Sequence, residues 1–504
     1  MASRRGEFIM NRPWYTACEH QVGPYWSNPT TALGIFLLTF AAFAWLTPQS
    51  PDNPQVVTRL GLTLSVVESG QLDIDRFADR TKDKALFGRH FYADKVPGLS
   101  FLAIPVVAVT TKVINAMGST VDSNKPADFA RLATSVTIAV NGFISALATA
   151  ALFLTAIRLG ATRPGALFAA GALAFATPFL GWSTAFLAHS VSGSLLMFAA
   201  AAITFAFAGD PPVSPRRPTL FGLGVGLLLG YTLVVDLTTA PACLLGGIVT
   251  LALAARARGE HFVQIASGIV VGGVLGLLPL PVYNQLAFGS PLTLGYSAVV
   301  GSYAEGMQQG FFGITWPSPG VVVQLLFGLY RGLLPLSPIL VLVPVGLYVM
   351  WQAPSTRVAA AAILVVFCSF LWINASYFYW WGGASLGPRH LVQALPLCCL
   401  ALAFAWPRGF WARSVTLVLL GASLVLSMIC AVTDIFAPAR FRNPLIDFFL
   451  PAFLTPEKLV KSLPIILAWV LFGLLFLSRS PFTGIRLMLS GSTSKRSHLS
   501  SDVG

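Results

Sequence analysis

The feature that most constrains this chain is the recurrence of apolar runs close to the length needed to cross a bilayer. A transmembrane helix takes roughly 20 apolar residues, and the sequence holds twelve runs near that length. They cover residues 30–46, 132–157, 165–182, 185–207, 219–235, 239–255, 262–283, 333–351, 358–377, 391–406, 415–432 and 463–477. Charged residues make up 10% of the chain, against about 25% in soluble domains. We predict an all-α polytopic membrane protein of about 12 transmembrane helices.

The distribution of basic residues sets the expected orientation. The net charge is +13, but the arginines and lysines are spread over short loops instead of one face, so no nucleic-acid partner is expected. Cytoplasmic loops carry an excess of Lys and Arg. This rule places both termini in the cytoplasm, together with the loops that contain Arg158 and Arg163, Arg216 and Arg217, Arg256 and Arg258, and Arg408 and Arg413. Most acids then lie on the external face.

Residues 98–117 are apolar but broken, and a crossing there would move the later basic loops to the other side. We therefore expect an amphipathic or re-entrant helix against the outer leaflet. The predicted order is a cytoplasmic N-terminus (1–29), a transmembrane module (30–285) with a long external loop (47–131), an external loop (286–332), a second transmembrane module (333–479) with external loops at 378–390 and 434–461, and a cytoplasmic tail (480–504). The glycine-rich stretches GLGVG and VVGGVLG indicate close helix packing, not a dinucleotide loop.

Residues 73–97 collect ionisable groups more densely than any other stretch of the chain. The preceding residues 55–67 have apolar side chains at helical spacing, which indicates a short helix resting on the membrane surface. Paired charges in a solvated loop explain some of the acids, such as Asp79. Asp94 and Lys95 stand where the chain returns to the membrane, and ionisable groups at such a depth indicate a functional site. Asp94 suits a general base, and Lys95 suits a phosphate partner.

A second polar segment lies at residues 380–391. Arg389 and His390 open an apolar run there, and the positive end of a helix favours an anion. A snorkelling arginine and an interfacial histidine explain either residue alone, but together they favour a binding site. Elsewhere, Asn284 suits sugar hydroxyls or a helix end. His189 fits a core histidine, and Asp236 fits a helix cap.

Two motifs in the first external loop resemble a known superfamily. Glu68-Ser69-Gly70 ends the first predicted surface helix, and Tyr92-Ala93-Asp94-Lys95-Val96-Pro97 precedes the second. This pattern resembles the GT-C glycosyltransferases, in particular the lipid A aminoarabinose transferases and the protein O-mannosyltransferases. Val96 replaces one proline of the family's Lys-Pro-Pro neighbourhood. The family's early Asp-Glu pair is represented by Asp52-Asn53, without the glutamate.

The resemblance implies a GT-C-like bundle with juxtamembrane helices, and an acid of the first external loop as catalytic base. Asp52 is the first candidate by family position and Asp94 the second by local setting, with Asp75 and Asp83 in reserve. The donor phosphate would meet cations. The remaining candidates would contact substrate. Lys95, Arg389 and His390 are the expected phosphate ligands, and Asp75, Asp83, His90, Tyr92, Asn284 and Trp381 the expected substrate contacts.

The function that follows is inverting transfer of a sugar from a polyprenyl-phosphate carrier to a hydroxyl of a glycolipid, polysaccharide or protein. The reaction would take place on the outer face of the cell membrane. No cofactor is expected beyond the lipid-linked donor, and a divalent metal stays an open alternative without assigned ligands. The competing interpretation is a transporter or flippase of lipid-linked sugars, since many helices and polar groups in the membrane also suit one. A non-catalytic binding partner is a third.

Overall fold

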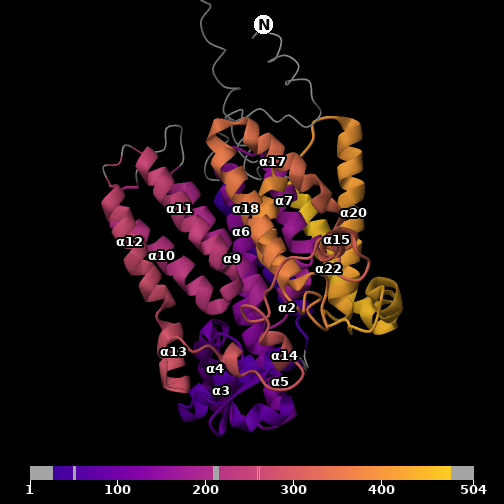
Figure 1. Ribbon diagram of the computed structural model, residues 1–504. Helices are drawn as coiled ribbons and strands as arrows, with labels where there is room; N and C mark the ends of the chain where they lie inside the picture. The colour runs from indigo at the N-terminus through magenta and orange to yellow at the C-terminus, as the bar shows by residue number, and fades with distance from the viewer. Residues whose placement is uncertain (1–26, 49–52, 208–214, 258, 260, 478–504) are drawn as a thin grey trace, which may run out of the picture.

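The computed structural model describes residues 27–48, 53–207, 215–257, 259 and 261–477, and the chain forms an upright bundle of helices (Figure 1). Within these residues, 10 helices are long and apolar enough to cross a membrane, so this is a multi-pass membrane protein. They are Asn28–Leu46, Gly98–Ala116, Pro126–Arg158, Ala188–Ala206, Pro218–Val235, Leu237–Arg256, Phe262–Phe288, Pro354–Ser376, Phe410–Thr433 and Pro456–Phe476.

The upright helices come from both halves of the chain. The first half supplies α2 (Ser27–Leu46), α6 (Phe143–Arg158), α7 (Arg163–Phe175), α8 (Phe179–Trp182), α9 (Ala188–Ala206), α10 (Pro218–Val235), α11 (Ala240–Arg256) and α12 (Phe262–Leu277). The second half supplies α16 (Leu333–Leu336), η5 (Pro338–Leu342), α17 (Val343–Gln352), α18 (Pro354–Ser376), η6 (Arg389–Ala394), α19 (Leu395–Leu402), α20 (Phe410–Thr433) and α22 (Pro456–Leu477). One large buried cluster of Leu, Phe and Ala side chains joins the two halves.

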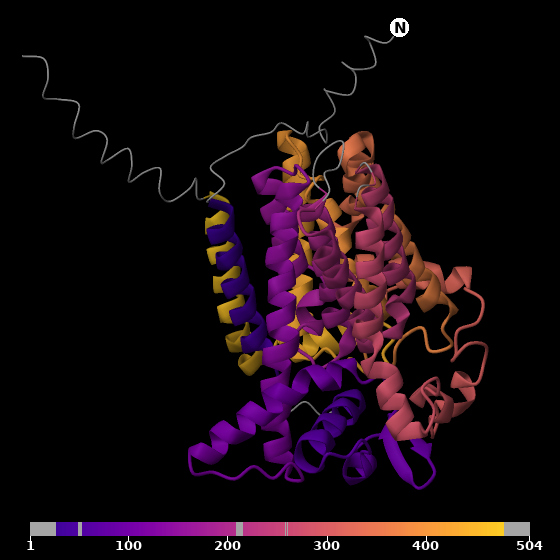
Figure 2. The ribbon, with the colours of Figure 1, turned by 90° about the vertical axis from the view of Figure 1, so that its left-hand side faces the viewer.

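The all-α membrane fold is confirmed, whereas the predicted count of twelve spanning helices is not. Residues 165–182 form α7 and the short α8, because the helix ends before the Thr177-Pro178 dipeptide. Residues 333–351 likewise divide into α16, η5 and α17, and residues 391–406 form only η6 and the short α19, so three of the predicted runs fall short of a span. Conversely α4 (Gly98–Ala116) meets the length and composition of a span, although Figure 2 shows it crossing obliquely at the lower end of the bundle.

The first loop forms a cap over this lower end. It comprises α3 (Pro54–Ser69), η1 (Asp75–Arg80), α4, α5 (Pro126–Val136) and the helical segment η2 (Thr137–Gly142) that continues into α6. Figures 1 and 2 place α13 (Pro279–Phe288) at the same end, and Figure 1 adds α14 (Ala304–Met307). The other elements are η3 (Leu237–Thr239), η4 (Gly295–Ala298), α15 (Pro319–Phe327), η7 (Leu445–Phe449) and α21 (Leu450–Phe453).

Helix α3 is not the surface helix that its sequence suggests. Asn53 caps it by accepting a hydrogen bond from the Gln55 amide at 2.9 Å, and Gly70 ends it at φ 69°. Between these limits every residue from 55 to 65 is buried. The apolar side chains of α3 pack with α4, α5 and α9 in a second core. The cap therefore has a hydrophobic interior of its own.

A two-stranded hairpin follows η1, and the sequence analysis did not anticipate it. Strand β1 (Lys84–Phe87) pairs antiparallel with β2 (His90–Ala93), with Lys84 opposite Ala93 and Phe87 opposite His90. Gly88 turns the chain at φ 62°, a conformation that glycine adopts without steric cost. The hairpin lies at the lower end of the bundle, beside the cap helices.

Reciprocal glycine contacts hold α10 against α12, as the glycine-rich stretches predicted. A Cβ atom added at Gly226 would lie 2.3 Å from the Ile269 carbonyl oxygen, and one at Gly272 would lie 2.1 Å from that of Leu223. Such distances leave no room for a side chain, so the two backbones are in direct contact.

Replacing Gly226 with Ala should therefore destabilise the protein by about 1–3 kcal/mol, because the added methyl group forces the helices apart. Gly224 lies on the same helix with nothing within 4 Å of its added Cβ, so Gly224→Ala is the matched control and should leave stability unchanged. Thermal unfolding of the purified protein in detergent measures both. Equal melting temperatures for the two variants would contradict the packing described.

Candidate functional site

The open end of the hairpin brings two buried carboxyl groups together. Because Lys84 pairs with Ala93, the next residues outward, Asp83 and Asp94, face one another across the two chains. Both are buried, with 8% and 3% of their surface exposed. The structure thus joins two acids that the sequence analysis proposed separately.

Lys95 supplies the positive charge beside these acids. Its ammonium forms an ion pair and a hydrogen bond with Asp94 Oδ2. Burial raises the pKa of Asp94, which the neighbouring Asp83 also raises and Lys95 opposes. Burial would lower the pKa of Lys95, but the Asp94 and Asp83 carboxylates outweigh it and raise that pKa. Lys95 is therefore held as the ammonium ion.

The other carboxylate oxygen, Asp94 Oδ1, is buried and has no hydrogen-bond partner among the described residues. A buried acceptor without a partner costs free energy, so such an atom is uncommon unless a ligand uses it. Its position beside a fixed cation suits a group that accepts a proton from a bound hydroxyl.

Arg59 is a buried cation that the sequence analysis did not assign to the site. Its guanidinium donates to the Gln55 side-chain oxygen at 3.0 Å, and its Nε has no partner among the described residues. It lies within electrostatic reach of Asp83, Asp94 and Asp236. The signal was a single arginine inside the apolar run of α3, and its burial is unusual because an arginine is rarely buried unless it is paired.

The second polar segment folds around Arg389 and His390 at the start of η6. Arg389 Nε donates to His390 Nε2 at 3.3 Å, which fixes that ring nitrogen as the acceptor. Gly382, at φ 73°, allows the close approach, because a Cβ there would lie 2.9 Å from the Arg389 side chain. The buried Arg331 donates to the carbonyls of Gly383, Ser385 and Ala437, and this holds the loop in place. Trp381 packs against Tyr379 with ring centroids 4.5 Å apart.

Asp236 joins this segment to α9 and α10. Its Oδ1 accepts from the Thr238 amide at 3.1 Å, the capping contact expected from sequence. Its Oδ2 accepts from Gln393 Nε2 at 2.7 Å and lies 3.5 Å from His189 Nδ1. Burial would raise the pKa of Asp236, but the contacts with His189 and Thr238 lower it to about 2. The buried His189 also packs edge-on against His390, with centroids 5.2 Å apart, so it lies beside this segment.

Aromatic residues connect the two polar segments. The Tyr377 ring lies 5.7 Å from that of His390, and the Lys95 ammonium lies 5.9 Å from the centroid of the Tyr296 ring. Lys95 is also within electrostatic reach of His390 and Tyr377. We call the combined group the ionic cluster. Its members are Arg59, Asp83, Asp94, Lys95, His189, Asp236, Arg389 and His390.

Two predicted substrate contacts lie at the other end of the hairpin. Asp75 Oδ2 is 2.7 Å from His90 Nδ1, and this contact raises the pKa of the exposed His90. With Asp73 they form a group whose ligand atoms lie within 4.8 Å of one another, a donor set that fits a divalent metal ion.

The remaining candidates stand in ordinary structural contacts or outside the described residues. Tyr92 packs edge-on against Phe288 at 5.3 Å. The buried Asn284 donates to the Pro291 carbonyl at 3.1 Å and fixes the following loop. Asp52, the first candidate for the base by family position, lies outside the described residues.

Comparison with known proteins finds similarity at the level of solved structures. Neither a protein-family model nor a curated protein matches the chain. One similar structure is the oligosaccharyltransferase AglB of Archaeoglobus fulgidus, in complex with an inhibitory peptide and a dolichol-phosphate. Its identity is 10%, its TM-score is 0.45, and the match covers 82% of this chain but only 56% of AglB. Another is ArnT of Cupriavidus metallidurans bound to undecaprenyl phosphate, with 14% identity, a TM-score of 0.47 and coverage of 91% and 78%. Both similarities concern the fold alone.

Removing the ion pair between Lys95 and Asp94 should lower the free energy of unfolding of the protein. Lys95→Met leaves the Asp94 carboxylate buried without its cation, a change that costs about 3–5 kcal/mol at neutral pH. The loss should shrink as the pH falls, because Asp94, whose pKa is raised, then takes up a proton and becomes neutral. Thermal unfolding in detergent at several pH values measures it. The control is Lys82→Met, which changes an exposed lysine. Equal melting temperatures for Lys95→Met and Lys82→Met would contradict the pairing.

Proposed function

We propose that this protein is an inverting glycosyltransferase that moves a sugar from a polyprenyl-phosphate carrier to a hydroxyl group. The observation that carries the proposal is the ionic cluster. It sets a buried carboxylate with a free oxygen beside cations, at one end of a bundle of apolar helices. A lipid-borne phosphate sugar needs this combination, because its chain lies in the bilayer while its head group reacts at the interface.

Asp94 is the proposed base on the grounds of its setting. A hydroxyl is a weak nucleophile, so a carboxylate within hydrogen-bond reach must take its proton as the new bond forms. The raised pKa of Asp94 makes it a stronger base than an ordinary carboxylate, and its Oδ1 is free to accept. Asp83 is the alternative across the hairpin, and Asp52 stays a prediction from the family motif.

The displacement balances as follows. The acceptor oxygen bonds to the anomeric carbon, and the bond from that carbon to the phosphate oxygen breaks with its electron pair staying on the phosphate. The acceptor's proton goes to Asp94. The charge that develops on the phosphate is met by Lys95 and Arg389, with Arg59 as a further cation. His390 would position Arg389 through their mutual hydrogen bond. A single displacement inverts the anomeric centre.

The proposed orientation puts the ionic cluster on the external face of the cell membrane and both termini in the cytoplasm. The support is the basic loops that connect α6 to α7 and α19 to α20, with Arg158, Arg163, Arg408 and Arg413. The positive-inside tendency assigns these loops to the cytoplasm. The divisions at residues 30–285 and 333–479 remain the proposed transmembrane modules. Acceptors are then hydroxyl-bearing glycolipids, polysaccharides or proteins of the envelope.

Asp94→Asn should abolish transfer, because it removes the base with little change of volume. Loss of a general base lowers the rate by about 10²–10⁴-fold. The assay follows radiolabelled sugar from the polyprenyl-phosphate pool into products in membranes that contain each variant. The exposed Asp79, in the same loop, provides the control Asp79→Asn. Full transfer by Asp94→Asn would remove Asp94 from the reaction, and carrier crossing the bilayer without product would favour the flippase.

The dependence of kcat/KM on pH should report the environment of Asp94. The base works as the carboxylate, so activity falls as the pH drops through its raised pKa. Asp83→Asn should shift this acid limb to lower pH, because it removes a neighbouring charge that raises the pKa of Asp94. Lys95→Met should shift it to higher pH. An acid limb that neither substitution moves would show that another group titrates.

A further inference from the structure

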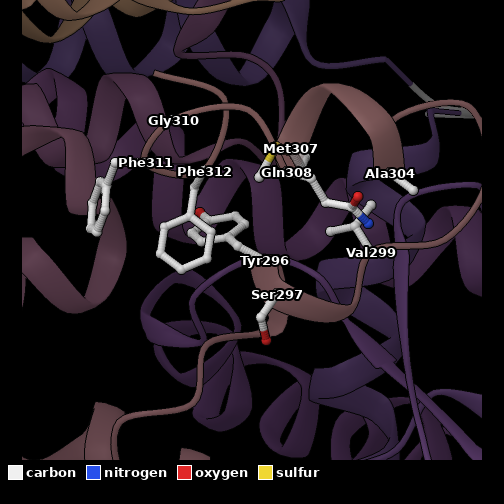
Figure 3. A pocket seen from close by; sticks show the side chains of 9 residues that line it. All are labelled: Tyr296, Ser297, Val299, Ala304, Met307, Gln308, Gly310, Phe311 and Phe312. Carbon is white, nitrogen blue, oxygen red and sulfur yellow. The ribbon is translucent and has the colours of Figure 1, made fainter. Parts of the chain in front are cut away.

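A pocket of about 250 Å³ opens beside the ionic cluster, in the loop between α13 and α15. Figure 3 shows the Phe312 and Tyr296 rings close together, with the Gln308 amide beside Val299 and the Ser297 hydroxyl pointing away from the rings. The ring centroids of Tyr296 and Phe312 lie 5.9 Å apart. The full lining is Tyr296, Ser297, Val299, Ala304, Met307, Gln308, Gly310, Phe311 and Phe312.

The backbone at the pocket is strained in a way that positions an aromatic ring. Phe312 has φ 51°, and no other non-glycine residue in the described parts of the chain has a positive φ. A bulky residue in this conformation is a true outlier, and strain of this kind gathers at functional sites. Gly310 and Gly313, at φ 55° and 84°, flank it and let the chain turn. A Cβ at Gly313 would lie 2.5 Å from the Phe378 ring, so the turn is tightly enclosed.

The pocket is built onto the same hairpin as Asp83 and Asp94. The Val300 amide donates to the Lys84 carbonyl at 3.2 Å, and Val299 forms an isolated bridge with Ala85. A Cβ at Gly295 would lie 3.0 Å from the Ala93 carbonyl oxygen, so the pocket wall touches the strand that leads to Asp94. Tyr296 lines the pocket and also lies near the Lys95 ammonium. A ligand in the pocket is therefore held next to the ionic cluster.

We propose that this pocket binds a single uncharged sugar ring, a proposal that rests on the function above for the source of that ring. The Phe312 and Tyr296 rings offer negative faces to the C–H groups of a sugar. The Gln308 amide and the Tyr296 hydroxyl can form hydrogen bonds with its hydroxyl groups. The volume falls below the range of about 300–1,000 Å³ usual for drug-sized ligands, so the pocket itself suits one sugar ring.

The charge of the lining selects against ionised sugars. Its nine residues include no acid and no base, and burying a charged group without a partner is unfavourable. The Lys95 ammonium, 5.9 Å from the Tyr296 centroid, further repels an amino sugar. The site thus distinguishes neutral hexoses and pentoses from cationic and anionic ones.

Saturation-transfer NMR on the full-length protein in lipid nanodiscs tests this, with neutral methyl glycosides, methyl glucuronide and methyl glucosaminide as probes. Neutral glycosides should give signals, and the two charged probes should give weak ones. Phe312→Gly suits the φ of 51° and deletes the ring, so it should weaken binding about tenfold. Phe312→Tyr should retain binding. The control is Trp316→Ala, which removes an exposed aromatic residue of the same loop outside the lining and should change nothing.

Competition distinguishes the two sources of the ring. If the donor supplies it, sugar-bearing polyprenyl phosphate displaces the methyl glycoside, while bare polyprenyl phosphate does not. If the acceptor supplies it, neither lipid displaces it. The proposal would be overturned if neutral glycosides gave no signal, or if Phe312→Gly left their signal intact. It would also be overturned if the pocket preferred a charged probe, or preferred the alkyl phosphate decyl phosphate to the glycosides. The glycoside signal is measured without sugar transfer, so failure of the catalytic assignment leaves this result unaffected, and the reverse also holds.

Discussion

The contact between Lys95 and Asp94 is the interaction on which the functional end of this molecule depends. Asp83 and Asp94 face one another where the hairpin meets the bundle, and burial beside a second carboxyl group disfavours the ionised form of Asp94 unless a cation is near. Lys95 supplies that cation from the next position in the chain. Gly98 then lets α4 begin against the α10 backbone, because any Cβ there would lie 2.5 Å from Val234. The same short segment thus places the charges and joins the cap to the membrane helices.

The balance of charge in the ionic cluster determines how a bound phosphate would change the pKa of Asp94. The cluster combines three carboxylates, those of Asp83, Asp94 and Asp236, with the cations of Arg59, Lys95 and Arg389. Arrival of a phosphate adds negative charge to a nearly neutral group. Like charge raises the pKa of a carboxylate, so the donor itself would bring Asp94 closer to the pH at which a base works well. The reactive state would form only when the donor is present.

Local properties of the sequence were enough to predict the helices. Apolar length sets where a chain can cross a bilayer, and each of the twelve predicted runs coincides with helical structure. The run at residues 165–182 is interrupted at Thr177-Pro178, and the run at residues 333–351 at Ser337-Pro338. Each break falls at the residue before a proline, which disfavours the helical conformation. Both prolines are present in the sequence, but the prediction used only the length of each apolar run and therefore missed the breaks.

The site was only partly predictable, because its parts meet through long-range contacts. Asp94, Lys95, Arg389 and His390 could be singled out as ionisable residues at the edges of apolar runs. Their assembly with Arg59 depends on α4 and the hairpin covering α3, which no local pattern encodes. Residues 84–93 carried a signal for the hairpin in the turn at Gly88, yet the density of charges around it favoured a solvated loop.

The hairpin also explains why the binding pocket and the ionic cluster form one unit. Strand β1 pairs with β2 on one side and meets Val299 and Val300 on the other, so three chain segments share one set of backbone hydrogen bonds. Phe312 keeps its strained conformation because the glycines beside it are enclosed by the Phe378 ring and the Ile314 backbone. A sugar ring and a base held by one rigid element keep their relative positions without a separate ordering step. Such positioning is a large source of rate acceleration in reactions of weak nucleophiles, and under the proposed function it would come from the eight paired residues of this hairpin.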